Sequence, residues 1–281
     1  IRFMHLVTSI CLGIIQGLTE FLPISSSGHL VFFQTLFGVN QPELLFDTTL
    51  HLGTLVAICI YFRSDLTMMI RQTWGFAVRL CRGQQGPRQI HEIPHAALTL
   101  WVLIGTIPTA LIGILFRSQL ERLFGSVLIV GLMLIVTGMI LVLTKLFPPK
   151  GNTRNGLGLF TALAVGTAQG IAIIPGISRS GATIVCGMVC GVKRDLAARF
   201  SFILSIPAIM GAMALQLHAE NFDKVSLLPL FSGFATSLVM GLFALKILMN
   251  MVRKGNLALF APYCWLMGLV MVYLKFSTAL G

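Results

Sequence analysis

Two short polar stretches stand out in a chain that is otherwise strongly apolar. The first, "TEFLPISSSGHL" (residues 19–30), gathers a carboxylate, three serines, a glycine and a histidine. The second, "PGISRSGAT" (residues 175–183), combines two serines with an arginine and a threonine. Hydroxyls and free backbone N–H groups at the start of a helix form an anion site. Because the planar fork of arginine matches phosphate oxygens, the two stretches predict a site for a phosphate group.

The acidic side chain of the first stretch predicts a cation site. Gln16 and Glu20 are four residues apart, so they share one face of a helix. Their oxygen atoms suit a hard divalent cation, Mg²⁺ or Ca²⁺. The alternative is that Glu20 is neutral or simply pairs with Arg179. Asp47 and His51, also four residues apart, could touch the same site or pair at a helix entrance, and both interpretations stay open.

The serine run predicts both a helix start and a reactive hydroxyl. One of Ser25, Ser26 and Ser27 can cap the helix that follows, and Gly28 leaves backbone N–H groups accessible. His29 lies three residues after Ser26, within one helical turn. Histidine can serve as a general acid or base near neutral pH, so we expect a catalytic role, with a structural role as the alternative.

The second polar stretch repeats this arrangement and adds a positive charge. Ser178, Arg179 and Ser180 are followed by Thr183, which either donates a hydrogen bond to the ligand or caps the helix. An arginine inside a membrane needs an anionic partner. Gly176 is expected to permit a tight turn.

The composition places these polar groups inside a membrane protein. Of 281 residues, 56% are hydrophobic and only 10% are charged, and the mean hydropathy is +0.90. The apolar segments are spread over the whole length, which indicates one polytopic membrane domain. The net charge is +11, but the basic residues lie in short loops without interleaved aromatic residues. The charge therefore indicates membrane topology, and no nucleic-acid partner is expected.

The apolar segments predict an all-α fold with six transmembrane helices and two re-entrant hairpins. The six long segments are approximately Leu44–Phe62, Ile93–Phe116, Ser126–Phe147, Phe200–Leu217, Ser226–Met249 and Leu257–Lys275. Four shorter pieces flank the polar stretches: Leu6–Leu22, Leu30–Val39, Leu157–Ile174 and Ala182–Val192. Unwound backbone at membrane depth must be buried in protein or line a wet cavity, so each short pair is expected to be a re-entrant hairpin. A pair of ordinary helices with a surface loop is the alternative.

The two polar stretches belong to an internal repeat. "GIIQGLTEFLPISSSG" (residues 13–28) aligns with "GTAQGIAIIPGISRSG" (residues 166–181) at an offset of 153 residues. Residues 1–150 then form a first repeat and residues 151–281 a second one. Because three spans separate the copies, the second should be inverted, and paired broken helices of this kind place a site near the midplane of the bilayer.

The charges predict the orientation. If the loop from Arg63 to Glu92 is cytoplasmic, alternation puts fourteen basic residues on the cytoplasmic side and five outside, with Arg179 on neither. The positive-inside rule supports this choice. Both termini are then outside, the first hairpin enters from the exterior, and the second enters from the cytoplasm, so that their tips can meet.

The motifs resemble the undecaprenyl pyrophosphate phosphatase family, the bacitracin-resistance type of membrane phosphatase. The resemblance rests on "QGLTEFLPISSSGHL" (residues 16–30) and "PGISRSGAT" (residues 175–183), which match the family's (E/Q)xxxE, P-x-S-S-(S/T)-G-H and PGxSRSxxT patterns. Gln16 takes the glutamine option of the first pattern, which removes one charge from the expected cation site.

The resemblance implies hydrolysis of undecaprenyl pyrophosphate to undecaprenyl phosphate, the lipid carrier of cell-wall synthesis. It also implies a divalent cation and a site open to the periplasm or exterior of a bacterial inner membrane. The implied partners are a polyprenyl pyrophosphate lipid and the bilayer, and a homodimer is left open. The resemblance implies that Gln16 and Glu20 hold the metal, that Ser26 and His29 act in catalysis, and that Ser178, Arg179 and Thr183 bind pyrophosphate. Together with the anion-site pattern, the candidate residues are these: metal binding by Gln16 and Glu20, catalysis by Glu20, Ser26, His29 and Arg179, and substrate binding by Ser25, Ser27, Ser178, Arg179, Ser180 and Thr183.

Two questions stay open at this point. Ser26 could attack the terminal phosphorus while His29 takes its proton, or His29 could activate a water molecule directly. Inverted repeats with broken helices are also typical of transporters, so the chain could carry a lipid phosphate without hydrolysing it. A membrane scaffold is a third interpretation, but it would leave Glu20, His29 and Arg179 unexplained at membrane depth.

Overall fold

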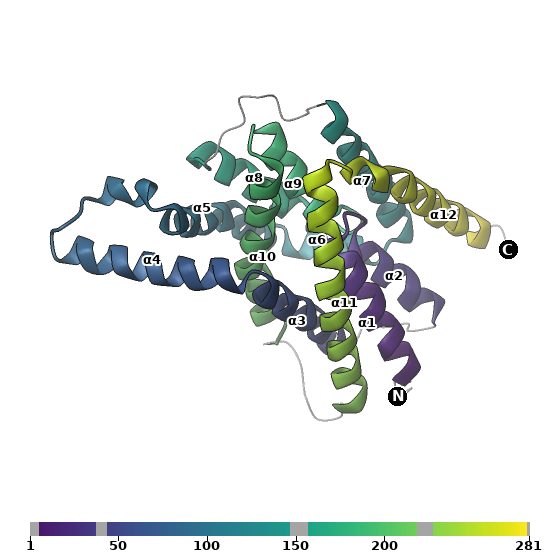
Figure 1. Ribbon diagram of the computed structural model, residues 1–281. Helices are drawn as coiled ribbons and strands as arrows, with labels where there is room; N and C mark the ends of the chain where they lie inside the picture. The colour runs from purple at the N-terminus through teal and green to yellow at the C-terminus, as the bar shows by residue number, and fades with distance from the viewer. Residues whose placement is uncertain (1–5, 38–43, 147–156, 218–226, 280–281) are drawn as a thin grey trace.

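The chain folds into helices, seen in a computed structural model that describes residues 6–37, 44–146, 157–217 and 227–279 (Figure 1). Every regular element in these ranges is helical. The elements are α1 (Leu6–Phe21), α2 (Ser26–Leu36), α3 (Leu44–Tyr61), α4 (Arg63–Cys81), η1 (Pro87–Glu92), α5 (Pro94–Leu115), α6 (Arg117–Phe124), α7 (Val127–Leu146), α8 (Leu159–Ile171), α9 (Arg179–Val189), α10 (Arg194–Leu217), α11 (Leu227–Lys254), η2 (Leu257–Phe260) and α12 (Ala261–Ala279).

The long helices fit a multi-pass membrane protein. In the described ranges five helices (α5, α7, α10, α11 and α12, the last with η2) are long and apolar enough to cross a bilayer, and the count is six if the bent pair α3–α4 forms one span. Large apolar side chains such as Phe160 and Leu227 are more than three-quarters exposed, as expected for a surface that faces lipid. The predicted all-α fold is therefore confirmed, with five or six candidate spans in the described ranges where the sequence predicts six.

The stretch from Arg63 to Glu92, expected to be a loop, is mostly helical. Helix α4 begins one residue after Phe62, where the chain bends by 72° from α3, and it lies beside α5 (Figure 1). Its helical start is stabilised from α10, because Arg199 Nη1 donates to Asp65 Oδ1 at 2.5 Å. Met69 and Phe76 are buried on its inner face. The predicted loop is therefore wrong, since these tertiary contacts order a segment whose polar sequence carries no apolar run.

Two helix boundaries also differ from the prediction. Helix α10 begins at Arg194, six residues before the predicted Phe200, because Asp195 and Arg199 form an ion pair across one helical turn. Helix α11 continues past Met249 to Lys254, so that its basic end lies beyond the apolar segment. The predicted end at Phe147 and the predicted start at Ser226 fall outside the described residues.

The four short apolar pieces form two broken helix pairs. Helices α1 and α2 are separated by residues 22–25, and α8 and α9 by residues 172–178. Helix α1 packs on α11 and α8 packs on α5. Both contacts depend on glycine: a Cβ on Gly166 would lie 2.0 Å from the carbonyl oxygen of Gly105, and a Cβ on Gly17 would lie 2.7 Å from that of Ser237.

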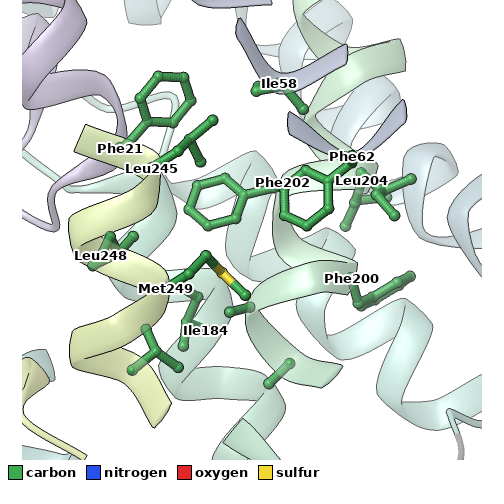
Figure 2. Packing of buried hydrophobic residues seen from close by; sticks show 14 of the residues in the cluster. Phe21, Ile58, Phe62, Ile184, Phe200, Phe202, Leu204, Leu245, Leu248 and Met249 are labelled. Atoms are coloured by element: carbon green, nitrogen blue, oxygen red, sulfur yellow. The ribbon is translucent and has the colours of Figure 1, made fainter. Parts of the chain in front are cut away.

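The main hydrophobic core fixes the end of α1 against α10 and α11 (Figure 2). Phe21 is completely buried, and its ring meets that of Phe202 edge-on at 5.8 Å between centroids. Phe62 stacks on the same Phe202 ring at 6.0 Å. Because Phe21 follows Glu20 directly, this packing fixes the position of the carboxylate that the sequence singled out.

Candidate functional site

The two polar stretches meet in the structure. Glu20, at the end of α1, forms an ion pair through Oε1 with Nη2 of Arg179, the first residue of α9. The backbones are close as well, because a Cβ on Gly28 would lie 3.6 Å from the Cα of Gly176 and a Cβ on Gly181 would lie 3.3 Å from Pro23 Cβ. Gly176 has a φ of +95°, which fits the predicted tight turn.

Glu20 is the centre of a buried polar cluster. Its side chain is 6% exposed, and Oε2 accepts hydrogen bonds from Ser26 Oγ at 2.6 Å and from Gln16 Nε2 at 3.1 Å. Gln16 lies one helical turn before Glu20, as the spacing predicts. A hydroxyl that donates to a carboxylate can pass its proton to that carboxylate, which is the arrangement that a serine nucleophile requires.

Serines cap both helices that follow the breaks. Ser25 Oγ accepts from Gly28 N at 3.4 Å and caps α2, while Ser178 Oγ accepts from Gly181 N at 3.2 Å and caps α9. Each capping hydroxyl also lies 3.2 Å from the hydroxyl of the serine two residues later, Ser27 or Ser180. The N-terminal ends of two helices therefore lie beside the cluster, because Ser26 begins α2, Arg179 begins α9, and both contact Glu20.

Two predicted residues make their contacts away from Glu20. Thr183 is fully buried, donates to the carbonyl oxygen of Arg179 at 2.7 Å, and lies 2.5 Å from Ser201 Oγ on α10. His29 is also buried, with Nδ1 2.8 Å from the carbonyl oxygen of Ser25 and Nε2 2.7 Å from the hydroxyl of Tyr263. Both ring nitrogens of His29 are therefore engaged by groups other than Ser26.

Two further residues complete the surroundings. His51, whose role the sequence left open, lies in the cluster, with Nδ1 2.9 Å from Gln16 Nε2 and 3.7 Å from Glu20 Oε2. Asp47 lies elsewhere and accepts from Gln34 at 2.7 Å. Sequence reasoning missed Tyr263, because it is 234 residues from His29 and carries no local signal beyond an aromatic ring in an apolar helix.

Two buried atoms of the cluster have no hydrogen-bond partner in the described part of the chain. They are Oε1 of Gln16, an acceptor, and Nη1 of Arg179, a donor. Buried polar groups in proteins are nearly always paired, so such exceptions point to a ligand. A free guanidinium donor suits an anion, and a free amide oxygen suits a cation.

The oxygen atoms near Glu20 fit a hard cation only in part. Gln16 Oε1 is free, while both oxygens of Glu20 already accept hydrogen bonds. In the described ranges no group of three or more His, Cys, Asp or Glu residues is arranged to hold a metal ion. A cation here would therefore need further oxygen ligands from the substrate or from water.

Comparison with known proteins places this chain in a family. Residues 9–270 match the family described as bacitracin resistance protein BacA. The undecaprenyl-diphosphatase of Desulforapulum autotrophicum is 43% identical over 278 residues, which cover 97% of this chain and 99% of the relative. The undecaprenyl-diphosphatase of Desulfosudis oleivorans is 45% identical over 96% of this chain and 99% of the relative. The undecaprenyl-diphosphatase of Methanosphaera stadtmanae is 39% identical over 97% of this chain and 99% of the relative. The chain therefore belongs to the bacitracin resistance protein BacA family.

Proposed function

We propose that this chain hydrolyses undecaprenyl pyrophosphate to undecaprenyl phosphate and inorganic phosphate. Its relatives carry the name undecaprenyl-diphosphatase over nearly their full lengths. The product is the lipid carrier of cell-wall synthesis, so the reaction recycles that carrier. The comparisons give no support to the alternative of a transporter that moves lipid phosphate without hydrolysis.

One observation carries the chemistry: the contact between the two polar stretches leaves one face of Arg179 free. Nη2 is paired with Glu20, whereas Nη1 is buried without a partner in the described ranges. A guanidinium that is already fixed on one side and open on the other is preorganised for a phosphate oxygen. The hydroxyl of Ser26 lies on the same carboxylate, so nucleophile and anion binder meet at Glu20.

The reaction proceeds in two displacements. Ser26 Oγ attacks the terminal phosphorus, Glu20 takes the hydroxyl proton, and the bond between that phosphorus and the bridging oxygen breaks to release undecaprenyl phosphate. Water then attacks the phosphoserine, inorganic phosphate leaves, and the serine hydroxyl regains its proton. The other route, with His29 taking a proton from Ser26 or water, requires His29 to release Ser25 or Tyr263 first.

The helix starts bind the diphosphate. Ser25, Ser27, Ser178 and Ser180 place hydroxyls at the N-terminal ends of α2 and α9, where the helix dipoles favour an anion. Thr183 contributes to substrate binding indirectly, by holding the start of α9 in place. Its hydroxyl donates to the carbonyl oxygen of Arg179 and contacts the Ser201 hydroxyl on α10.

A divalent cation, Mg²⁺ or Ca²⁺, is the expected cofactor. Gln16 and Glu20 would hold it, and the free Oε1 of Gln16 is the observation that favours this placement. When bound, it would neutralise charge on the diphosphate.

We infer that the two halves, residues 1–150 and 151–281, are inverted repeats whose hairpins are re-entrant and meet near the midplane. The helix contacts support this idea. If α1, α3, α5 and α7 correspond to α8, α10, α11 and α12, the contact of α1 with α11 corresponds to that of α8 with α5. The contact of α3 with α11 then corresponds to that of α10 with α5. Helices α7 and α12 are counterparts of each other, and they pack together as a pair.

The proposed orientation opens the site to the periplasm or exterior of the inner membrane. It rests on the excess of basic residues in the loops assigned to the cytoplasm. The two termini, which it places outside, lie beyond the described residues. A homodimer also stays a prediction.

Phosphate release from undecaprenyl pyrophosphate by the purified protein in detergent tests the function. We expect release that EDTA abolishes and that Mg²⁺ or Ca²⁺ restores. Ser26→Ala should lower kcat by a factor of about 10³ or more, as for loss of a nucleophile with its base. The matched control is Arg71→Ala, which removes an exposed arginine of α4 and should leave turnover unchanged.

Two results would contradict this proposal. Turnover by Ser26→Ala near the native rate would eliminate the serine nucleophile, whereas a phosphorylated Ser26 trapped during turnover would support it. No release by a folded protein that binds the lipid would favour the transporter, and lipid flipping in liposomes would then be measured.

A further inference from the structure

The ring of His29 is held on both sides. Its Nδ1 lies 2.8 Å from the carbonyl oxygen of Ser25, which can only accept a hydrogen bond, so Nδ1 carries the proton. In the neutral ring Nε2 is then the acceptor, and it accepts a hydrogen bond from the hydroxyl of Tyr263, with 2.7 Å between the nitrogen and the oxygen. With an exposed fraction of 1%, His29 is closed off from water, and these two bonds fix its tautomer and its orientation.

The residue at one end of this chain of bonds is strained. Ser25 has a φ of +67° and is the one non-glycine residue with positive φ in the described ranges. Such a conformation is energetically unfavourable for a residue with a side chain and persists only where its surroundings enforce it. The carbonyl of Ser25 receives the Nδ1–H of His29, so His29 is one of the groups that enforce it.

The second broken helix pair provides an internal comparison. Ser178 occupies the place of Ser25 and caps its helix in the same way, but its φ is −73°. The position that corresponds to His29 is Ala182. The half of the protein without a strained serine therefore also lacks the histidine that could hold one.

The start of α12 contacts the first broken helix pair, α1 and α2, and the residues between them. The rings of His29 and Tyr263 are nearly parallel, with 5.6 Å between centroids and an interplanar angle of 7°. The next residue, Cys264, is fully buried, and its Sγ lies 3.5 Å from the carbonyl oxygen of Pro23. Tyr263 is thus placed by two contacts of α12 with residues 23–29.

We propose that Tyr263 and His29 form a clamp that holds Ser25 in its left-handed conformation and thereby aims Ser26 at Glu20. Both are positioning residues, and neither takes the proton of the nucleophile. The inference rests on the proposed function for its kinetic test, since the clamp acts on the same site. It gives His29 no role as a general acid or base, and it gives Tyr263, which is far from His29 in the sequence, a role in positioning the nucleophile.

Substitutions that separate hydrogen bonding from proton transfer provide the kinetic test. Tyr263→Phe keeps the ring and removes the hydroxyl, and should lower kcat about tenfold with KM within about twofold of the native value. His29→Asn retains an N–H that can reach the Ser25 carbonyl but cannot act as an acid or base at neutral pH. It should therefore be at least about tenfold more active than His29→Ala.

A matched control and a double substitution sharpen this test. Tyr273→Phe removes a hydroxyl from an exposed tyrosine of the same helix and should leave kcat unchanged. Ser25→Gly relieves the strain, because glycine adopts positive φ freely. Adding Tyr263→Phe to Ser25→Gly should then lower kcat by less than about twofold. The clamp is overturned if His29→Asn is no more active than His29→Ala, or if the effects of Ser25→Gly and Tyr263→Phe simply multiply.

Nitrogen NMR of the full-length protein in lipid provides a readout that needs no activity. With ¹⁵N-labelled histidine, the His29 resonances should show the Nδ1–H tautomer, and the Nε2 resonance should move in Tyr263→Phe and stay in place in Tyr273→Phe. An Nε2–H tautomer in the native protein would overturn the clamp. Absence of phosphate release with the expected NMR result would instead remove the proposed function and leave the geometry of the clamp intact.

Discussion

The two terminal nitrogens of Arg179 differ in their contacts. Nη2 is paired with Glu20, whereas Nη1 is buried without a partner in the described ranges, and the proposed function assigns it to a phosphate oxygen. A lysine has a single charged nitrogen and can serve either Glu20 or a phosphate in a fixed geometry, but not both. We therefore expect Arg179→Lys to lower kcat/KM about 100-fold or more, measured by phosphate release, while the protein keeps its native melting temperature within a few degrees.

Arg179→Ala is the comparison that separates charge from geometry. It leaves the buried carboxylate of Glu20 without its cation, so both activity and melting temperature should fall. If Arg179→Lys were as active as the native protein, the bidentate role of the guanidinium would be wrong.

At the scale of single residues, sequence alone could predict the groups that share a helical turn or a capping position. Gln16 and Glu20, and the caps at Ser25 and Ser178, follow from spacing and from the chemistry of serine at a helix start. The contacts of Tyr263 and His51 depend on how α12 and α3 pack, which no local pattern encodes. The bond from Ser26 to Glu20 needs the turn between them, and that turn became known only from the structure.

At the scale of elements, the broken helices are positioned by close backbone contacts. Gly166 of α8 approaches α5 so closely that a Cβ would lie 2.0 Å from the Gly105 carbonyl oxygen. Gly166→Ala must push the two helices apart, and we expect a loss of about 1–3 kcal/mol in stability. The melting temperature in detergent should fall accordingly.

The matched control for this substitution is Gly211→Ala in α10. A Cβ there would meet no atom within 4 Å, and alanine favours the helix, so the melting temperature should stay constant or rise. Equal melting temperatures of the two variants would show that α8 can move from α5 without cost, and would remove the argument that this contact holds the second hairpin.

Elements were predictable from sequence where an apolar run defines them. The long spans and the four short pieces follow from hydropathy and from the interrupting polar residues. Helix α4 was missed because its ends and one face are charged, and because the forces that order it, such as the pair of Arg199 with Asp65, come from α10. Tertiary contacts of this kind leave no signal in the segment itself.

At the scale of the whole molecule, the orientation decides from which side a lipid diphosphate reaches Glu20. Fourteen basic residues lie in the segment from Arg63 to Glu92, at or after the end of α7, at the start of α10 and at the end of α11, so these parts of the chain are expected in the cytoplasm. Cys81, exposed at the end of α4, is then cytoplasmic, and Ser118 in the exposed helix α6 is external. The two positions lie at opposite ends of α5 and form a direct test.

Labelling with a membrane-impermeant maleimide distinguishes the two orientations. With the other five cysteines replaced by alanine, Cys81 should react in inside-out vesicles and stay unlabelled in right-side-out vesicles. A second variant, with Cys81→Ala and Ser118→Cys, should give the opposite pattern. Labelling of Cys81 from the exterior would place the first hairpin in contact with the cytoplasm. The substrate would then have to reach Glu20 from the cytoplasmic leaflet, and the excess of basic residues would mark the outer face against the positive-inside rule.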